Sequence, residues 1–273
     1  MTNVLYEARD KVALVTLNRP EKLNALSPEL LDELSAALNR AGGDREVRVV
    51  VIRGEGRAFS TGYDLEAFAN QPLLGPESWR ERHRRNIDRW LQIWNLPKPV
   101  IAQVHGYCVG GGSDLALCSD LIVCAQDATF GYPPARVWGS PTTAMWTYRL
   151  GLERSKRLLL TGDALDGRRA VEWGLASEAV PADELDAAGL ALARRVARLP
   201  VNQLHMMKLL VNATIEQMGL ATTQLLGTLL DGAARHTPEG VAFSEAALQN
   251  VAGAVRARDE PFGDYAFERR PAG

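Results

Sequence analysis

Two glycine-containing loops could hold a developing negative charge. The first contains Gly62, and the second contains the run Gly110-Gly111-Gly112. Glycine lets the backbone approach a ligand closely, and the N–H groups at a helix N-terminus lie at the positive end of the helix dipole. Two such N–H groups from separate loops could bind one oxyanion and so stabilise a transition state. The same glycines also suit tight turns and close helix packing. From the glycines alone, an oxyanion-binding role and a purely structural role are both open.

Several titratable side chains lie on or near these loops. Asp114 follows Gly112 by two residues, in the first turn of an expected helix, where it could carry protons or complement the helix dipole. We expect Asp64 to close its own loop by side-chain hydrogen bonds, and His105 to pack or bond to a loop rather than act as a base. The basic stretch 80–85, which includes His83, is typical of a solvated helix face.

The glycine run matches neither of the common phosphate-binding loops. A Walker A loop requires GxxxxGK[ST], and the segment from Gly106 to Ser113 has no lysine at the required place. The dinucleotide fingerprint GxGxxG also fails, because Cys108 stands where its second glycine is needed and Leu115 follows Gly112 by three residues. Both nucleotide-binding interpretations are therefore excluded on the sequence.

Each candidate loop follows a predicted strand. Val12–Leu17 and Val47–Ile52 are rich in β-branched residues, and Ser27-Pro28-Glu29 is typical of a helix N-terminus with Ser27 as its cap. The repeat of strand, loop and helix predicts an α/β architecture with helices packed on a sheet. We expect strands at 12–17, 47–52, 100–104 and 121–124, and helices at 28–42, 79–94 and a short one ending at Leu117.

The second half of the chain is predicted to be mostly helical. The chain has no proline between Val201 and His236, and we place a boundary near Pro200 between an α/β core at 1–200 and a helical region at 201–273. We expect helices at 152–160, 182–199, 201–215 and 220–235, with a short strand at 176–180.

Composition restricts the class of protein. The 273 residues are 46% apolar, and 31 basic against 33 acidic residues leave a net charge of −2. This is ordinary for a globular protein and does not favour nucleic acid as a main partner. Cys108, Cys118 and Cys124 fit no disulfide framework or metal knuckle, so we expect reduced thiols and no metal site. Early charged residues and the lack of a long apolar run predict a cytoplasmic protein without a membrane span.

Many blocks of this sequence resemble the crotonase (enoyl-CoA hydratase/isomerase) superfamily in the order in which that family has them. The resemblance covers most of the chain, and the combination of blocks is more specific than any one of them. The blocks are Asn18–Leu26, Ala58–Leu65, Pro99–Ala102, His105–Asp114, Phe130–Pro133, Leu160–Leu165 and Glu172–Ala176.

The resemblance implies a fold, a substrate class and a set of site residues. The fold would be a spiral of ββα units with a C-terminal helical region that builds homotrimers or dimers of trimers. The substrate would be an acyl-CoA thioester, with coenzyme A as part of the substrate and no separate cofactor. The backbone N–H groups of Tyr63 and Gly111 would hold the thioester oxygen, and Asp114 would move protons. Arg256 and Arg258 lie roughly where the family offers a basic residue to CoA. The remaining substrate-binding positions would be Lys22, Leu23, Ala25, Thr61, Asp64, Leu65, Tyr107, Gly110, Tyr132, Pro133, Pro134 and Trp138.

One position departs from the family pattern. Hydratases of this family use two glutamates that hold water and exchange protons with the substrate. Asp114 stands at the first position, and Pro134, whose side chain has no titratable atom, stands at the second. Tyr132, Arg136 and Trp138 are nearby candidates to supply polarity or stacking, and Tyr132 could replace the missing acid or be structural.

The sequence therefore predicts an acyl-CoA enzyme, classed as a lyase of fatty acid metabolism, that stabilises a thioester enolate. Simple two-glutamate hydration should not operate unchanged, because general acid–base catalysis needs a titratable group within reach of the moving proton. C–C bond hydrolysis and double-bond isomerisation with the same oxyanion hole are alternatives. A catalytically silent acyl-CoA binding protein is a third.

Overall fold

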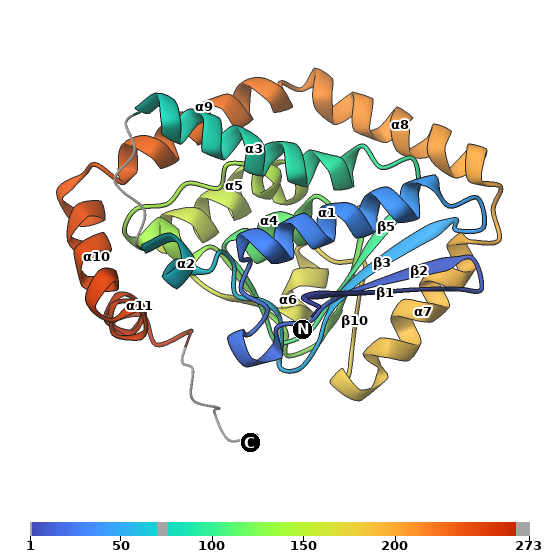
Figure 1. The fold of residues 1–273 in the computed structure, drawn as a ribbon, viewed down its shortest axis with the longest axis horizontal. Helices are drawn as coiled ribbons and strands as arrows, with labels where there is room; N and C mark the ends of the chain where they lie inside the picture. Colours follow the sequence, from blue (N-terminus) through green and yellow to red (C-terminus); the bar gives the residue numbers. More distant parts are fainter. Residues whose placement is uncertain (1, 70–75, 266–273) are drawn as a thin grey trace.

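The computed structural model describes residues 2–69 and 76–265 of the chain (Figure 1). Within these ranges, only the backbone is described at positions 68, 69, 76–80, 82, 83 and 86. The side chain of His83 and the end of the predicted C-terminal region, 266–273, therefore lie outside the described residues.

The described residues form a six-stranded sheet in the spatial order β1-β2-β3-β5-β7-β10. β1 pairs with β2 antiparallel, and the other neighbours are parallel. The central strands are buried on both faces, as their continuous β-branched runs predict. The sequence interpretation missed β1, an edge strand with exposed charged residues. The strands are β1 (Val4–Arg9), β2 (Val12–Leu17), β3 (Val49–Gly54), β5 (Val100–Val104), β7 (Leu121–Ala125) and β10 (Glu178–Val180).

A second, four-stranded sheet in the order β4-β6-β8-β9 determines where the glycine loops meet. β4, β6 and β8 are parallel, so their carboxyl ends reach the same edge of the sheet. Gly110 and Tyr132 follow the ends of β6 and β8 directly, Gly62 follows the end of β4 by two residues, and such an edge is where α/β proteins commonly bind ligands. The sequence interpretation placed β4 and β6 in loops and assigned no strand at β8 or β9. They are β4 (Ala58–Ser60), β6 (Tyr107–Val109), β8 (Thr129–Gly131) and β9 (Leu165–Asp166).

Helices cover both faces of the larger sheet. α1 (Pro28–Gly43) packs on β1 and β2, and α7 (Leu185–Val196) packs on β3, β5 and β7 from the opposite side (Figure 1). The predicted cap is present, because Ser27 accepts a hydrogen bond from the Leu30 N–H over 3.3 Å. The predicted helix 182–199 is shorter than expected: residues 182–184 form the 3₁₀ turn η3 (Ala182–Glu184) before α7 begins.

Shorter helices and turns surround the smaller sheet. The predicted helix 152–160 begins earlier, at Met145, and continues across a break at Gly151, whose φ of +74° suits glycine. These elements are α2 (Leu65–Ala69), α4 (Gly111–Leu117), α5 (Met145–Thr161), α6 (Gly167–Glu172) and the 3₁₀ turns η1 (Pro20–Lys22) and η2 (Pro133–Arg136).

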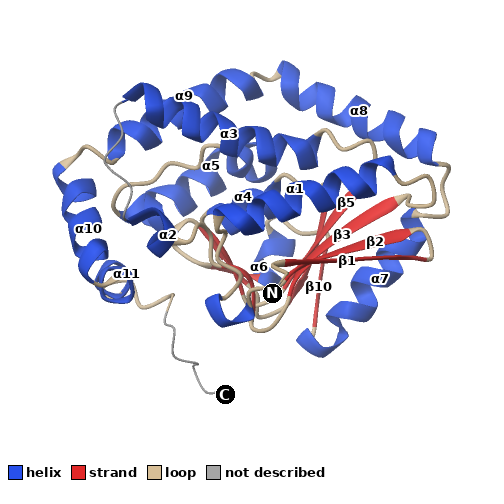
Figure 2. Cartoon of the chain, in the orientation of Figure 1, coloured by secondary structure: helices blue, strands red, loops and turns tan. Residues whose placement is uncertain are grey.

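The C-terminal helices wrap around the core (Figure 2). α9 packs against α3 (Pro76–Trp94), and α10 packs against α2 beside the first glycine loop. None of the described helices is both long and apolar enough to cross a bilayer. Cys108, Cys118 and Cys124 are buried free thiols, as expected. The C-terminal helices are α8 (Val201–Gln217), α9 (Leu220–Ala234), α10 (Pro238–Gln249) and α11 (Val251–Asp259).

Candidate active site

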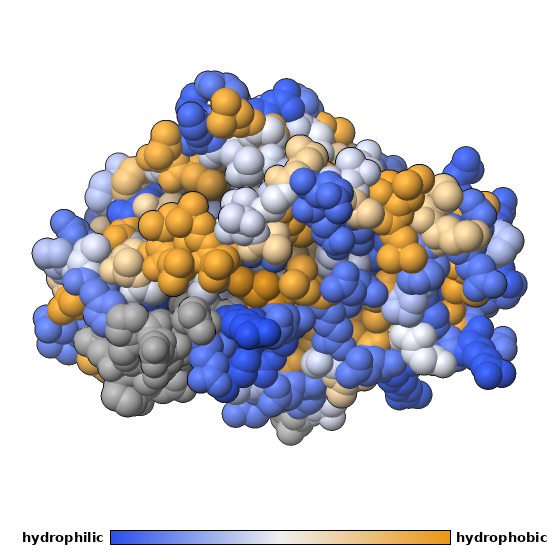
Figure 3. All heavy atoms as spheres, turned by 90° about the horizontal axis from the view of Figure 1, so that it is seen from above, coloured by the Kyte–Doolittle hydropathy of each residue, from blue (hydrophilic) through white to orange (hydrophobic). Residues whose placement is uncertain are grey.

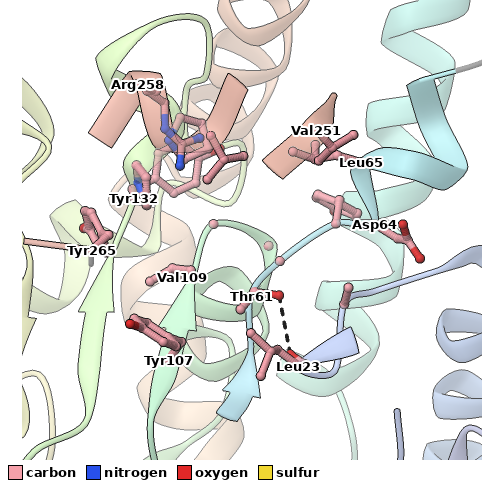
Figure 4. A pocket seen from close by; sticks show the side chains of 18 of the residues that line it. Leu23, Thr61, Asp64, Leu65, Tyr107, Val109, Tyr132, Val251, Arg258 and Tyr265 are labelled. Atoms are coloured by element: carbon pink, nitrogen blue, oxygen red, sulfur yellow. Dashed lines mark hydrogen bonds between the residues drawn. The ribbon is translucent and has the colours of Figure 1, made fainter. Parts of the chain in front are cut away.

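A cavity of about 520 Å³ lies at the carboxyl ends of β4, β6 and β8, and α11 closes its other side (Figure 4). Every site residue that the sequence predicted lines this cavity, so the fold gathers positions that are far apart in the chain. They are Lys22, Leu23, Ala25, Thr61, Tyr63, Asp64, Leu65, Tyr107, Gly110, Gly111, Asp114, Tyr132, Pro133, Pro134 and Trp138.

The two glycine loops contact each other at this edge. Gly62 has a φ of +89°, and a Cβ added to it would lie 2.9 Å from the Val109 carbonyl oxygen and 3.0 Å from the Gly111 nitrogen. A Cβ added to Gly111 would lie 2.8 Å from Cε2 of Tyr63. The N–H groups of Ser113 and Asp114 donate to the carbonyl of the N-cap residue Gly110, whereas those of Gly111 and Gly112, at the start of α4, have no acceptor within the helix. The close approach therefore needs glycine, which agrees with both sequence interpretations of these loops.

The loop around residues 19–26 is bonded to the Gly62 loop. The backbone N–H and the hydroxyl of Thr61 both donate to the Leu23 carbonyl oxygen, over 3.2 and 3.4 Å (Figure 4). The Leu26 N–H donates to the Gly62 carbonyl over 2.8 Å. These bonds bring the predicted CoA-binding residues of the first loop to the mouth of the cavity.

Asp64 and His105 have the local roles that the sequence indicated. Asp64 accepts a hydrogen bond from the Ala67 N–H over 3.2 Å and pairs with Arg19 over 3.0 Å. His105 Nε2 lies 3.0 Å from the Gly56 carbonyl oxygen, so its ring bonds to a loop. At the cavity mouth Lys22 pairs with Glu66 over 2.6 Å.

Asp114 is buried in the cavity wall, with a relative exposure of 2%. Its Oδ1 accepts a hydrogen bond from the Thr143 hydroxyl over 2.6 Å. Burial raises the pKa of the Asp114 carboxyl to about 7, the Thr143 hydrogen bond lowers it, and the charge of Asp231 raises it. A carboxyl with a pKa near neutrality can both give and take a proton at physiological pH.

Pro134 lies in the 3₁₀ turn η2 and lines the cavity with a side chain that cannot titrate. Its carbonyl oxygen accepts N–H bonds from Val137, Trp138 and Gly139, which fold the following segment back over the turn. The Tyr132 hydroxyl donates to the Ser140 carbonyl over 2.9 Å, and burial raises the pKa of this tyrosine well above its usual value. The Tyr132 hydroxyl proton is therefore engaged with the backbone, which favours the structural interpretation of this residue.

The C-terminal helices add charged residues that the sequence interpretation missed. Asp231 of α9 and Arg235, which caps the C-terminal end of α9, line the cavity, as does Asp259 of α11. Asp231 is the one ionisable side chain in the sequence Leu220–Ala234, and a single acid in an apolar helix is a signal that could have revealed it. Arg235 pairs with Asp231 over 3.3 Å and lies over the Trp138 ring at 4.0 Å.

Of the C-terminal basic residues, Arg256 and Arg258 both line the cavity. Arg258 pairs with Asp259 over 2.6 Å, whereas Arg256 is exposed at the surface. Arg136 is not among the residues that line the cavity, so it does not supply the polarity that the sequence suggested for it. Its buried guanidinium pairs with Asp259 over 3.0 Å and Asp264 over 2.6 Å. These ion pairs tie η2 to the end of α11.

Residues 7–240 match the model of the enoyl-CoA hydratase/isomerase family. The chain belongs to this family. It is an acyl-CoA-processing enzyme of hydratase/lyase type, and the parallel sheets with added C-terminal helices are the fold expected of the enoyl-CoA hydratase/isomerase family.

Similar proteins include several hydratases of this family. An enoyl-CoA hydratase structure from Mycobacterium smegmatis superposes with a TM-score of 0.92 at 42% identity, covering 97% of this chain and 96% of that one. The hydroxycinnamoyl-CoA hydratase-lyase of Pseudomonas fluorescens is 36% identical over 71% of this chain and 72% of its own length. The 2,3-dehydroadipyl-CoA hydratase of Escherichia coli K12 is 32% identical over 84% of this chain and 91% of its own.

Proposed function

We propose that this enzyme converts an unsaturated acyl-CoA thioester through its enolate and adds water to it. The observation that carries the proposal is the position of Asp114, a buried carboxyl with a pKa of about 7 in the same cavity as the glycine loops. The backbone N–H groups of Tyr63 and Gly111 would hold the enolate oxygen, and Asp114 would exchange a proton with the substrate. Preorganised donors of this kind are commonly the largest catalytic contribution, and each is worth about 10² to 10³ in rate.

Charges at the mouth of the cavity support binding of the CoA arm. Lys22 and Arg256 both line the cavity and are exposed, so they would meet phosphate groups of CoA there, Lys22 by exchanging its exposed ion pair with Glu66 for the phosphate. Arg258 is already paired with Asp259, so we assign it to the cavity wall instead. The acyl chain would extend past Pro134 toward Trp138.

The reaction can be identified by incubating the enzyme with a panel of 2-enoyl-, 3-enoyl- and β-oxo-acyl-CoA thioesters in ¹⁸O-labelled or deuterated water. Hydration would place ¹⁸O in a new hydroxyl group, and Asp114→Asn should lower its rate about 10² to 10⁴-fold. Deuterium uptake with a moved double bond and no ¹⁸O would show an isomerase. Labelled carboxylate in a shortened product would show C–C hydrolysis. Saturable binding without turnover would identify a silent acyl-CoA binding protein.

We also propose that α8 and α9 form the contact between subunits of a homotrimer or a dimer of trimers. The face that carries these helices shows large apolar patches (Figure 3). Contiguous exposed apolar patches commonly mark protein interfaces. Light scattering after size-exclusion chromatography measures the mass, and Leu210→Glu together with Leu229→Glu should lower it toward that of one chain. The exposed residues are Met206, Met207, Leu209, Leu210, Val211, Leu225, Leu226, Leu229 and Leu230.

A further inference from the structure

Asp231 places a second buried carboxylate in the cavity that contains Asp114. Both side chains have a relative exposure of 2% and both line the cavity. Burial is the main reason that the pKa values of Asp114, Tyr63 and Tyr132 are raised, and the charge of Asp231 raises all three further, so Asp231 lies within electrostatic reach of these residues. Two carboxyl groups in one enclosed space, one of them titrating near neutrality, is an arrangement suited to acid–base chemistry.

α9 buries polar residues and exposes leucines, which is the reverse of an ordinary surface helix. Asp231 lies on the buried side of this helix. Gln224, Thr228 and Asp231 face inward and are buried, whereas leucines of the same helix are exposed on the outer face. A surface helix normally buries its apolar side. Of these inward polar residues Asp231 lines the cavity, whereas Gln224 bonds to the Thr143 carbonyl and helps to hold the helix in place.

One segment holds both carboxylates. The Ser140 N–H donates to Asp231 Oδ1 over 3.1 Å, and the Thr143 hydroxyl donates to Asp114 Oδ1 over 2.6 Å. α9 in turn bonds to this segment, because the Gln224 side-chain amide donates to the Thr143 carbonyl over 3.2 Å. The segment comes shortly after Pro134, the position at which the resemblance places a glutamate.

The two carboxyl groups have different surroundings. Asp231 Oδ2 lies 3.3 Å from the Arg235 guanidinium, a fixed positive charge that balances an ionised carboxylate. The hydrogen bond to Asp114 comes from a neutral hydroxyl, and burial disfavours the charged form of this group. Asp231 thus has a charged partner and Asp114 a neutral one, and such different surroundings suit the two carboxyl groups to the separate roles of base and acid.

We propose that Asp231 is the second catalytic group of the site and replaces the carboxylate that Pro134 removes. The inference rests on the proposed hydration. The Asp231 carboxylate takes a proton from water while the water oxygen bonds to C3, and the C2=C3 electron pair moves toward the thioester to form the enolate. The enolate then takes a proton at C2 from the Asp114 carboxyl. The proton on Asp231 returns to Asp114 through solvent, so one water molecule is added overall.

The test compares the unmodified enzyme with Asp231→Asn, which keeps an acceptor for the Ser140 N–H, and with Asp114→Asn. Glu245→Gln is the matched control, because it makes the same change at an exposed position of α10. Two rates are measured: hydration of the best 2-enoyl-CoA as a function of pH, and deuterium exchange at C2 of the saturated acyl-CoA. Exchange at C2 needs only the residue that removes and returns the proton on that carbon.

We expect Asp231→Asn to lower kcat for hydration about 10² to 10⁴-fold with little change in KM, and to remove the acidic limb of the pH profile. C2 exchange should survive in Asp231→Asn and be lost in Asp114→Asn. Asp231→Glu, which restores a carboxylate, should recover part of the hydration rate.

An Asp231→Asn enzyme with unchanged hydration rate and pH profile would overturn the inference while leaving the proposed function intact. Parallel loss of hydration, C2 exchange and melting temperature would also overturn it, by showing a structural role. If the unmodified enzyme hydrates no thioester, the proposed function itself fails.

Discussion

The hydroxyl of Thr143 donates a hydrogen bond of 2.6 Å to Oδ1 of Asp114, and both side chains are buried. Thr143 comes just before α5, whereas Asp114 lies in α4, and these two helices pack against each other. The bond therefore couples the protonation of the central carboxyl to the segment that also holds Asp231.

Thr143→Val should raise the pKa of Asp114, because it removes a donor that stabilises the ionised carboxylate. A hydrogen bond to a charged group contributes about 1.5–3 kcal/mol, so we expect the alkaline limb of the activity profile to move up by about one to two pH units. The measurement is kcat/KM as a function of pH. Thr143→Ser keeps the hydroxyl and should retain the original profile, and an unchanged profile in Thr143→Val would show that Asp114 does not control this limb.

Asp114→Asn should change how stability depends on pH. The carboxyl has a pKa of about 7 in the folded chain against an ordinary value of 3.8, so the folded state binds the proton more tightly. Stability of the unmodified enzyme should thus decrease as the pH rises from about 4 to about 7, and then level off. The free energy of unfolding, measured with urea, should fall less between about pH 4 and about pH 7 in Asp114→Asn than in the unmodified enzyme. The fall should differ between the two proteins by a few kcal/mol. Equal slopes in the two proteins would contradict the raised pKa.

Gly62→Ala should lower turnover about 10² to 10³-fold, because the added Cβ would push apart the backbones of the two glycine loops. Gly174→Ala is the control. Its φ of +80° resembles the +89° of Gly62, but an added Cβ there meets nothing within 4 Å. Both variants carry a similar backbone strain of about 1–2 kcal/mol, so comparison of kcat at equal folded fraction isolates the effect on the site. Equal activity in the two variants would show that the close contact between the two glycine loops is not needed for turnover.

Arg136→Met should destabilise the protein by about 1–3 kcal/mol, because it removes the cation that pairs with Asp264, whereas Asp259 keeps its ion pair with Arg258. Amide hydrogen exchange in α11 should also become faster, since this ion pair ties the helix to η2. Arg157→Met is the matched control: its ion pair with Asp163 is largely exposed and should contribute less than about 1 kcal/mol. Similar losses for both variants would show that Arg136 does not anchor α11.

Local sequence patterns predicted much of the core. The β-branched runs at 12–17 and 100–104 became buried strands, and the Ser27-Pro28 signal began α1 as expected. β4, β6 and β8 were missed because strands of three residues carry no measurable periodicity. Their pairing depends on partners far along the chain, which a local pattern does not contain.

The residues of the candidate site also fall into two groups: those that the sequence could predict and those that needed the fold. Glycines at Gly62 and Gly111 and the carboxyl of Asp114 could be selected from the sequence, because residue type and spacing already restrict what a loop and a helix start can do. The sequence left Tyr132 open between a structural residue and a replacement acid, and its hydrogen bond to the Ser140 carbonyl required the fold. Asp231, Arg235 and Asp259 lie more than a hundred residues after the glycine run, and although a lone acid in an apolar helix marks Asp231 as unusual, only the fold shows that these residues share the cavity of the glycine run.

By itself, the sequence determined the α/β core and the loops that carry glycine. These follow from backbone freedom and side-chain chemistry, which are properties of each residue and its near neighbours, whereas the carboxylate missing at Pro134 was implied by the resemblance to the family. Only the tertiary structure decided that α9 turns its polar face inward and brings Asp231 into the cavity that Asp114 lines. The reason is physical: burial, and the charges that burial brings together, depend on packing between distant segments.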